Sequence, residues 1–168
     1  MLFNMNITLI GMAGAGKSTV GRALAEKTRY NFIDVDDLLR DKFGKPLHLV
    51  IDEIGDEGFM MAEEEIILSL ASLDDTVISP GGSVIYTSRA MEYLRTISKI
   101  IFLDVPFEII EKRVDVSTRG LVGMGSKTLR ELFGERRPHY IKHAVATIEA
   151  NNKNVQELIN EVVATILL

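Results

Sequence analysis

Short apolar runs alternate with helix-length segments along the whole chain. The runs occupy residues 6–10, 31–34, 76–79, 99–105 and 146–149. Each is mainly apolar or β-branched and does not alternate cleanly with polar residues, which is typical of strands covered on both faces. Because strands and helices alternate, and no linker or repeat divides the chain, the pattern predicts a single α/β domain over residues 1–168 with a parallel sheet.

Helices are expected in the intervals between the strands. The predicted helical segments are 17–28, 36–43, 47–54, 59–71, 88–96, 107–114, 126–144 and 155–168. Gly44 is the expected C-cap of the second segment. Pro138 is expected to interrupt the long segment 126–144. Segments 47–54 and 59–71 are predicted to form a helical excursion over the sheet.

Residues 115–125 do not fit a regular element. They contain three glycines around Arg119 and have almost no helical pattern. A glycine-rich loop of this length in a compact domain is usually functional or mobile. The two interpretations are a closing lid that carries a cation, which is favoured, and a plain surface loop.

Composition restricts the class of protein. The 168 residues are 46% hydrophobic and 26% charged, as in an ordinary globular domain. With no cysteine in the chain, disulfides, thiolate metal sites and thiol nucleophiles are excluded. The N-terminal residues lack the basic region of a secretory signal, and no apolar run reaches membrane-spanning length, so we expect a cytoplasmic protein without a membrane partner.

The charge is unevenly distributed. The net charge of −5 argues against a general nucleic-acid binder. Residues 112–142 nevertheless carry eight Lys or Arg against three acids. A local basic excess suits a small polyanion such as ATP, although about half of these charges could simply be solvated helix residues. We therefore expect a small-molecule substrate and no nucleic-acid partner. We also expect the protein to be a monomer.

One stretch carries a specific chemical signal. Residues 11–19 read Gly-Met-Ala-Gly-Ala-Gly-Lys-Ser-Thr, which fits the P-loop pattern G-x-x-x-x-G-K-[ST] between a predicted strand and a predicted helix. Backbone N–H groups of such a loop converge on phosphate oxygens at the positive end of the helix. Lys17 is expected to neutralise the β- and γ-phosphates and Ser18 to ligate Mg²⁺. The residues predicted to contact ATP here are Gly11, Ala13, Gly14, Ala15, Gly16, Lys17, Ser18 and Thr19.

The ends of the other strands are the next places to search, because ligands of parallel sheets bind at the carboxyl ends of the strands. The second strand ends at Asp34, followed by Asp36 and Asp37. One carboxylate could join the Mg²⁺ shell and another could accept a proton from an acceptor hydroxyl. Asp34 and Asp36 are favoured for these functions, with the choice of base left open, and Asp37 is expected only to cap the next helix.

Two further strand ends carry weaker signals. The third is followed by Gly81 and Gly82, which permit close approach of a ligand to the backbone. The fourth ends at Asp104, for which a strand-to-helix cap is the preferred interpretation.

Phosphoryl transfer also needs cations near the γ-phosphate. Arg119, in the predicted lid, fits a mobile cation. Arg136 or Arg137, just before Pro138, fits a fixed anion clamp. Arg113 could stack on or flank the adenine.

With these motifs in hand, the chain resembles the shikimate kinase family of P-loop kinases nearly from end to end. Besides the P-loop, the resemblance covers Asp34-Val35-Asp36, the segment 54–59, Gly81-Gly82, Arg119 and the segment 136–140. It implies a three-layer fold with a five-stranded parallel sheet of order 2-3-1-4-5, a lid at about 115–125 and an acceptor-binding region at about 36–72. It also implies ATP and Mg²⁺ as cofactors.

The resemblance assigns roles to individual residues. It places Asp34 in the metal and catalytic region, Asp36 on the ring hydroxyls of the acceptor, and Arg136 on the carboxylate of shikimate. Lys17, Asp34 and Arg119 are the expected catalytic residues. Ser18 and Asp34 are the expected metal ligands, and Gly81 and Gly82 are expected beside the acceptor.

Three positions depart from the family pattern. Met60 follows Phe59 where the family has an arginine that pairs with the acceptor carboxylate. Pro80 and Ser83 flank a glycine pair where the family has three glycines, and Gly120 follows Arg119 in place of the usual proline. Loss of one charged contact would weaken acceptor binding by about 1.5–3 kcal/mol.

Three functional hypotheses remain at this point. The favoured one is an ATP- and Mg²⁺-dependent kinase that phosphorylates a hydroxyl of shikimate. The second is a related kinase for another polyol or for a nucleoside monophosphate. The third is a nucleotide-binding module with little catalysis, against which the retained Asp34, Arg119 and Arg136 argue.

Overall fold

The structure, a computed structural model, describes residues 5–71 and 73–167. Five parallel strands form one sheet in the order β2-β3-β1-β4-β5. Their bounds are β1 (Asn6–Ile10), β2 (Asn31–Asp34), β3 (Thr76–Ser79), β4 (Ser98–Asp104) and β5 (Ala146–Glu149). The predicted strands lie within one residue of these bounds, and the predicted α/β fold and strand order are confirmed.

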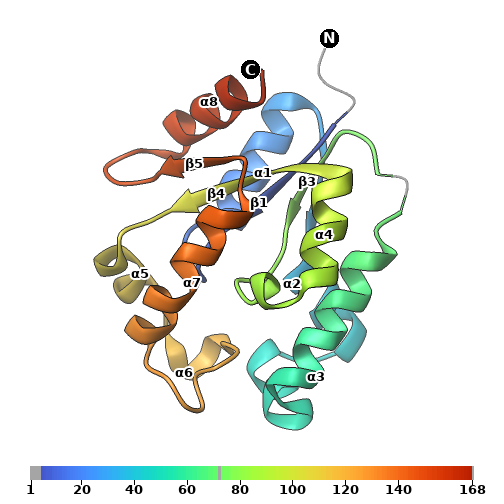
Figure 1. The fold of residues 1–168 in the computed structure, drawn as a ribbon, viewed down its shortest axis with the longest axis vertical. Coiled ribbons are helices and arrows are strands. Elements are labelled where there is room, and N and C mark those ends of the chain that lie inside the picture. Colours follow the sequence, from blue (N-terminus) through green and yellow to red (C-terminus); the bar gives the residue numbers. More distant parts are fainter. Residues whose placement is uncertain (1–4, 72, 168) are drawn as a thin grey trace.

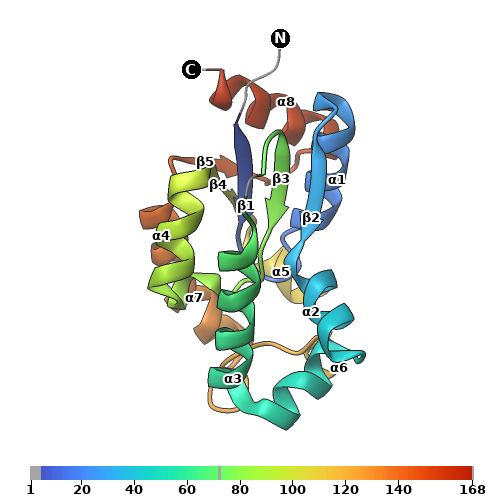
Figure 2. The same ribbon diagram turned by 90° about the vertical axis from the view of Figure 1, so that its right-hand side faces the viewer.

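Helices cover both faces of the sheet (Figures 1 and 2). Helices α1 (Lys17–Thr28) and α8 (Val155–Ile166) lie on one face. Helices α3 (Leu47–Ser69), α4 (Ser88–Ile97) and α7 (Leu129–His143) lie on the other. Shorter elements connect these layers: α2 (Val35–Phe43), the 3₁₀ helix η1 (Val84–Tyr86), α5 (Phe107–Arg113) and α6 (Val116–Arg119).

The sheet separates two hydrophobic cores. In β4, Ile100 and Phe102 belong to the core on the side of α3, α4 and α7, whereas Ile101 and Leu103 belong to the core on the side of α1 and α8. All four side chains are buried. Successive strand residues point to opposite faces, so a strand covered on both sides, such as β4, is apolar at most successive positions. This explains the mainly apolar runs in the sequence.

Helix α3 forms the predicted excursion. The two predicted segments 47–54 and 59–71 are a single element broken at Gly55, where φ is 73° and ψ is 172°. Only a residue without a side chain adopts such a backbone conformation readily. The first half of α3 therefore turns away and extends beyond the sheet (Figure 2). Residues 72 and 168, which close two of the predicted regions, lie outside the described residues.

The prediction that Pro138 interrupts a helix was wrong. Pro138 lies inside α7, which begins after a capping box between Thr128 and Glu131. A proline removes one helical hydrogen bond and usually only bends the helix. Leu132, Arg136 and Tyr140, four residues apart and all buried, anchor the turns on both sides of it.

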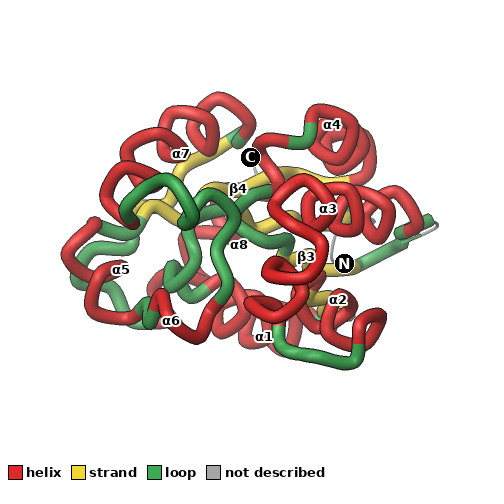
Figure 3. Tube along the Cα trace, turned by 90° about the horizontal axis from the view of Figure 1, so that it is seen from below, coloured by secondary structure: helices red, strands yellow, loops and turns green. Residues whose placement is uncertain are grey.

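The loops after β1 and β3, and the start of α2 directly after β2, gather at one end of the molecule, which Figure 3 views directly. Helix α6 lies there beside the first half of α3, as Figures 1 and 2 agree. It is a short helix within 115–125, where no regular element was predicted. No helix among the described residues is both long and apolar enough to cross a membrane.

Candidate active site

The loop between β1 and α1 has the conformation that its glycines predict. Gly14 and Gly16 have φ angles of 80° and 86°, in the left-handed region that glycine tolerates best. Gly16 is the N-cap of α1, so the free N–H groups of the first turn open toward the loop. This arrangement is a ready anion-binding site.

Lys17 is the first residue of α1 and is buried. Its Nζ donates hydrogen bonds to the carbonyl oxygens of Gly11, at 2.9 Å, and Met12, at 3.1 Å. Burial lowers the pKa of Lys17 to about 8, although the charge of Asp36 opposes this shift. A second anion near Nζ would favour the ammonium form, as expected for a group that meets a phosphate.

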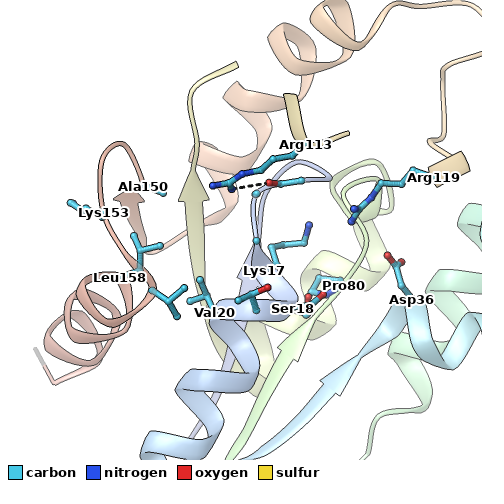
Figure 4. Close-up of a pocket in the computed structure, with 16 residues that line it drawn as sticks. Lys17, Ser18, Val20, Asp36, Pro80, Arg113, Arg119, Ala150, Lys153 and Leu158 are labelled. Atoms are coloured by element: carbon cyan, nitrogen blue, oxygen red, sulfur yellow. Dashed lines mark hydrogen bonds between the residues drawn. The ribbon is translucent and has the colours of Figure 1, made fainter. Parts of the chain in front are cut away.

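A cavity of about 410 Å³ lies along this loop. Figure 4 shows Asp36 and Arg119 at one end, and Ala150, Lys153 and Leu158 at the other. Arg113 lies over the loop, and its Nη1 donates a 3.2 Å hydrogen bond to the carbonyl oxygen of Gly14 (Figure 4).

Most of the predicted ATP-contacting residues line this cavity, and two do not. Gly11 lines neither this cavity nor the second one described below, and Ala13 lines only the second. The residues of the first cavity that lie in or near the loop are Gly14, Ala15, Gly16, Lys17, Ser18, Thr19 and Val20.

The far end of the cavity was missed from the sequence. It is formed by Ala150, Lys153, Val155 and Leu158, at the end of β5 and the start of α8. Residues 150–153 follow the carboxyl end of β5, and the tendency of ligands to bind at strand ends is the signal that indicates them.

Asp34 connects the loop with α2. Its Oδ2 accepts a 2.5 Å hydrogen bond from the hydroxyl of Ser18, and its Oδ1 accepts one from the backbone N–H of Asp36 at 3.0 Å. Asp34 is therefore the N-cap of α2. The prediction that Asp37 is the cap was wrong, because Asp37 pairs instead with Arg22 and Arg40 on the surface.

A second cavity of about 200 Å³ adjoins the first. Lys17, Asp36 and Arg119 line both cavities. Burial raises the pKa of Asp36, and the positive charge of Lys17 opposes this shift. The other charged residues that line the second cavity are Arg40 and Arg136, and Gly81 and Gly82 contribute backbone to its wall.

Arg136 is the better match to the predicted fixed clamp. It is only 1% exposed, and its Nη2 donates a 2.6 Å hydrogen bond to the carbonyl oxygen of Val122. No salt bridge to Arg136 is found within the described part of the chain. A buried guanidinium without a carboxylate partner can receive a ligand anion.

The neighbouring Arg137 has a different environment. It is half exposed, and its Nε and Nη2 contact the carboxylate of Asp104 at 2.6–3.1 Å. The prediction that Asp104 caps the next helix was wrong, because the N-cap of α5 is Pro106 and no side-chain cap is present.

Glu63 is a buried residue of the site that the sequence analysis missed. Its Oε1 accepts a hydrogen bond from the Gly81 N–H at 2.8 Å, and its Oε2 accepts one from the Ser83 hydroxyl at 3.1 Å. A Cβ atom added at Gly81 would lie 2.5 Å from Glu63 Oε1 and 3.3 Å from Asp36 Oδ1, so both carboxyl groups converge on this glycine. Burial, and then the charge of Asp36, raises the pKa of Glu63 to about 7.

A helical pattern around Glu63 could have revealed its burial. Phe59, Glu63 and Ile67 are spaced by four residues, and the two apolar members predict that all three share the buried face.

The segment around Arg119 closes the second cavity from the side of α3. A Cβ atom added at Gly120 would lie 2.5 Å from the backbone nitrogen of His48. The N–H of Gly123 donates a 2.9 Å hydrogen bond to the carboxylate of Asp56. These contacts hold residues 120–123 against α3 on both sides of its break at Gly55, while Arg119 lines both cavities.

Comparisons with known proteins agree with this geometry. A shikimate kinase family model matches residues 13–167. A shikimate kinase of Francisella tularensis subsp. novicida is 34% identical over 166 residues, which cover 96% of this chain and 94% of that protein.

Solved structures give the same result. A shikimate kinase from Acinetobacter baumannii, determined in complex with shikimate, has a TM-score of 0.88 and 32% identity, and the match covers 97% of this chain and 93% of that one. The shikimate kinase of Aquifex aeolicus has a TM-score of 0.81 and 27% identity, with coverage of 97% and 96%. The sequence, the fold and the two adjoining cavities all lead to one assignment: this chain belongs to the shikimate kinase family.

Proposed function

We propose that this protein transfers the γ-phosphoryl group of ATP to a hydroxyl group of shikimate, giving ADP and shikimate 3-phosphate. The observation that carries the proposal is the junction of two cavities at Lys17, Asp36 and Arg119. A kinase must bring a donor and an acceptor together at the transferring phosphorus, and these three side chains face both spaces.

The larger cavity suits ATP. Its end at Ala150, Val155 and Leu158 offers apolar surface for the adenine, and the guanidinium of Arg113 lies between this end and the loop. The loop N–H groups and Lys17 would bind the phosphates. The γ-phosphate would then lie at the end formed by Lys17, Arg119 and Asp36 (Figure 4).

Ser18 and Asp34 fit a magnesium site. A hydroxyl and a carboxylate oxygen 2.5 Å apart are hard oxygen ligands of the kind Mg²⁺ prefers. Within the described ranges, no three His, Cys, Asp or Glu side chains lie together in a way that could hold a metal ion by themselves. This suits an ion held mainly by phosphate oxygens and water, with Ser18 as a direct ligand and Asp34 behind it. When bound, Mg²⁺ would neutralise charge on the β- and γ-phosphates.

The smaller cavity suits the acceptor. Arg136 would bind its carboxylate, while the Gly81 and Gly82 backbone would line its ring. Asp36 would orient the reacting hydroxyl and accept its proton, since a buried carboxylate with a raised pKa is a better base. The hydroxyl oxygen would form the new bond to the γ-phosphorus as the bond from that phosphorus to the β–γ bridging oxygen breaks.

Lys17 and Arg119 would stabilise the negative charge on the transferring group, and residues 115–125 would act as the lid. A monomeric state remains a prediction. A cytoplasmic location remains a prediction.

The test is a coupled assay of ADP release with ATP, Mg²⁺ and a panel of acceptors. The panel contains shikimate, gluconate, a nucleoside monophosphate and a water-only control. We expect shikimate to give the highest kcat/KM, and ³¹P NMR of the product to show a phosphate monoester. Turnover with shikimate no faster than with water would refute the proposal, and preference for another acceptor would replace shikimate with that compound.

A further inference from the structure

The smaller cavity contains two cationic side chains that do not also line the larger one. Lys17 and Arg119 line both cavities, and their charges lie beside the expected γ-phosphate. Arg40 and Arg136 line the smaller cavity alone. The positive charges that face the acceptor cavity alone therefore come from Arg40 on α2 and Arg136 on α7.

No cation comes from the position where the sequence pattern of the family would place one. Met60 occupies that position on α3 and lines neither cavity. It is partly buried and packs against the apolar core, while its neighbour Phe59 contributes to the cavity wall. A thioether in this position supplies no charge for an anion.

Arg40 lies where it can supply the positive charge that Met60 lacks. It lies one helical turn after Asp36 on α2, so the two side chains share a helix face. Both side chains also line the smaller cavity. This places the guanidinium beside the group that would hold the acceptor hydroxyls.

Arg40 pairs with the surface carboxylate of Asp37, and this pair leaves it free to bind a ligand. Its Nη1 contacts Asp37 Oδ1 at 2.6 Å, and both side chains are about half exposed. An exposed pair at this spacing is weak, and a guanidinium has five N–H donors. Arg40 can therefore turn to a ligand carboxylate with little loss of stability.

We propose that Arg40 supplies the second cationic contact for the acceptor carboxylate, in place of the arginine that the family pattern would place at position 60. The carboxylate then lies between Arg40 on α2 and Arg136 on α7. This inference rests on the proposed shikimate kinase activity and names a specificity residue of the same site.

The test is a kinetic comparison of the unmodified protein with Arg40→Gln. We expect the KM for shikimate to rise about 10- to 100-fold, with the KM for ATP and the thermal midpoint unchanged. With the methyl ester of shikimate, which lacks the negative charge, Arg40→Gln is expected to change kcat/KM by less than twofold. Equal effects on the acid and the ester, or an unchanged KM for shikimate, would overturn the inference.

Asp37→Asn is the matched control, because it removes the surface pair but keeps Arg40. We expect it to leave the KM for shikimate within twofold of the original. A loss equal to that of Arg40→Gln would mean that Arg40 acts through the helix surface and not on the acceptor.

Met60→Arg tests whether Arg40 replaces an arginine at position 60, or whether any added positive charge improves shikimate binding. It is expected to restore the KM for shikimate at least tenfold in the Arg40→Gln background and to improve it much less in the unmodified protein. An equal improvement of the KM for shikimate in both backgrounds would contradict the inference that Arg40 performs the role of an arginine at position 60. Absence of any shikimate turnover by the unmodified protein would instead refute the proposed function, and the inference with it.

Discussion

The carboxylate of Glu63 accepts a hydrogen bond from the backbone N–H of Gly81 at 2.8 Å, behind the wall of the acceptor cavity. Glu63 is fully buried, and the Ser83 hydroxyl is its other hydrogen-bond donor. The burial of this carboxyl, with its pKa raised to about 7, makes its ionisation costly. Glu63 therefore makes the stability of the folded protein depend on pH.

We predict that Glu63 makes the protein less stable as the pH rises from 4.5 to about 7. The folded protein holds the Glu63 proton over this range while the unfolded chain releases it, so unfolding is favoured by rising pH. The effect is on the order of 3 kcal/mol. Glu63→Gln, which keeps the Gly81 contact, should flatten the dependence in urea unfolding at pH 5, 6, 7 and 8. Identical slopes for the two proteins would contradict this prediction.

A second prediction concerns Lys17 and the affinity for ATP. The pKa of Lys17 is lowered to about 8, so the ammonium is lost from the free protein above that pH. Bound phosphates favour the charged form, and ATP affinity should therefore fall by up to tenfold per pH unit above pH 8. Calorimetry at pH 9 in two buffers of different ionisation enthalpy should show proton uptake on ATP binding. No uptake would show that Lys17 does not titrate there.

Arg136 and Arg137 provide a matched pair of substitutions. Arg136→Lys keeps a buried charge but loses the fork of donors, so we expect kcat/KM for shikimate to fall about 10- to 100-fold. Arg137→Gln removes a partly exposed ion pair with Asp104 and should leave the KM for shikimate within twofold. Steady-state kinetics of both variants test the assignment of the clamp. A larger loss of shikimate kinetics in Arg137→Gln than in Arg136→Lys would assign the clamp to Arg137 instead.

Gly81 and Gly134 should respond in opposite ways to the same substitution. A Cβ atom at Gly81 would lie 2.5 Å from Glu63 Oε1, so Gly81→Ala should displace the wall and raise the KM for shikimate at least tenfold. Gly134 lies on the exposed face of α7 with no atom within 4 Å of an added Cβ. Gly134→Ala should raise stability by about 0.5–1 kcal/mol and leave the kinetics unchanged. Thermal melts and kinetics of both variants would show whether steric contact decides the outcome.

The fold was largely predictable because the strongest sequence signals coincide with the sheet. Five mainly apolar runs identified the five strands to within a residue, since strands covered on both faces favour apolar residues at successive positions. Pro138 misled the prediction because local propensity ignores Leu132 and Tyr140, whose burial holds the helix through the proline. The caps of α2 and α5 were misplaced because a cap depends on backbone angles at one residue.

The candidate site was predictable where a motif is continuous. The P-loop residues from Gly14 to Thr19 line the larger cavity as the motif predicts. The contact between Glu63 and Gly81 joins residues 18 positions apart, on an α-helix and after a strand. Periodicity within one segment indicates burial but does not identify the partner. The same limit applied to Arg40, whose place in the smaller cavity follows from the packing of α2 against α3.

Strand β2 passes into α2 without a loop, because Asp34 both ends the strand and caps the helix. The same carboxylate accepts the hydrogen bond from Ser18. An engineer who exchanges α2 between related enzymes to change their acceptor would therefore disturb the P-loop unless Asp34 and β2 move with it. The smallest transplantable unit for a new acceptor preference begins at residue 31, within the sheet.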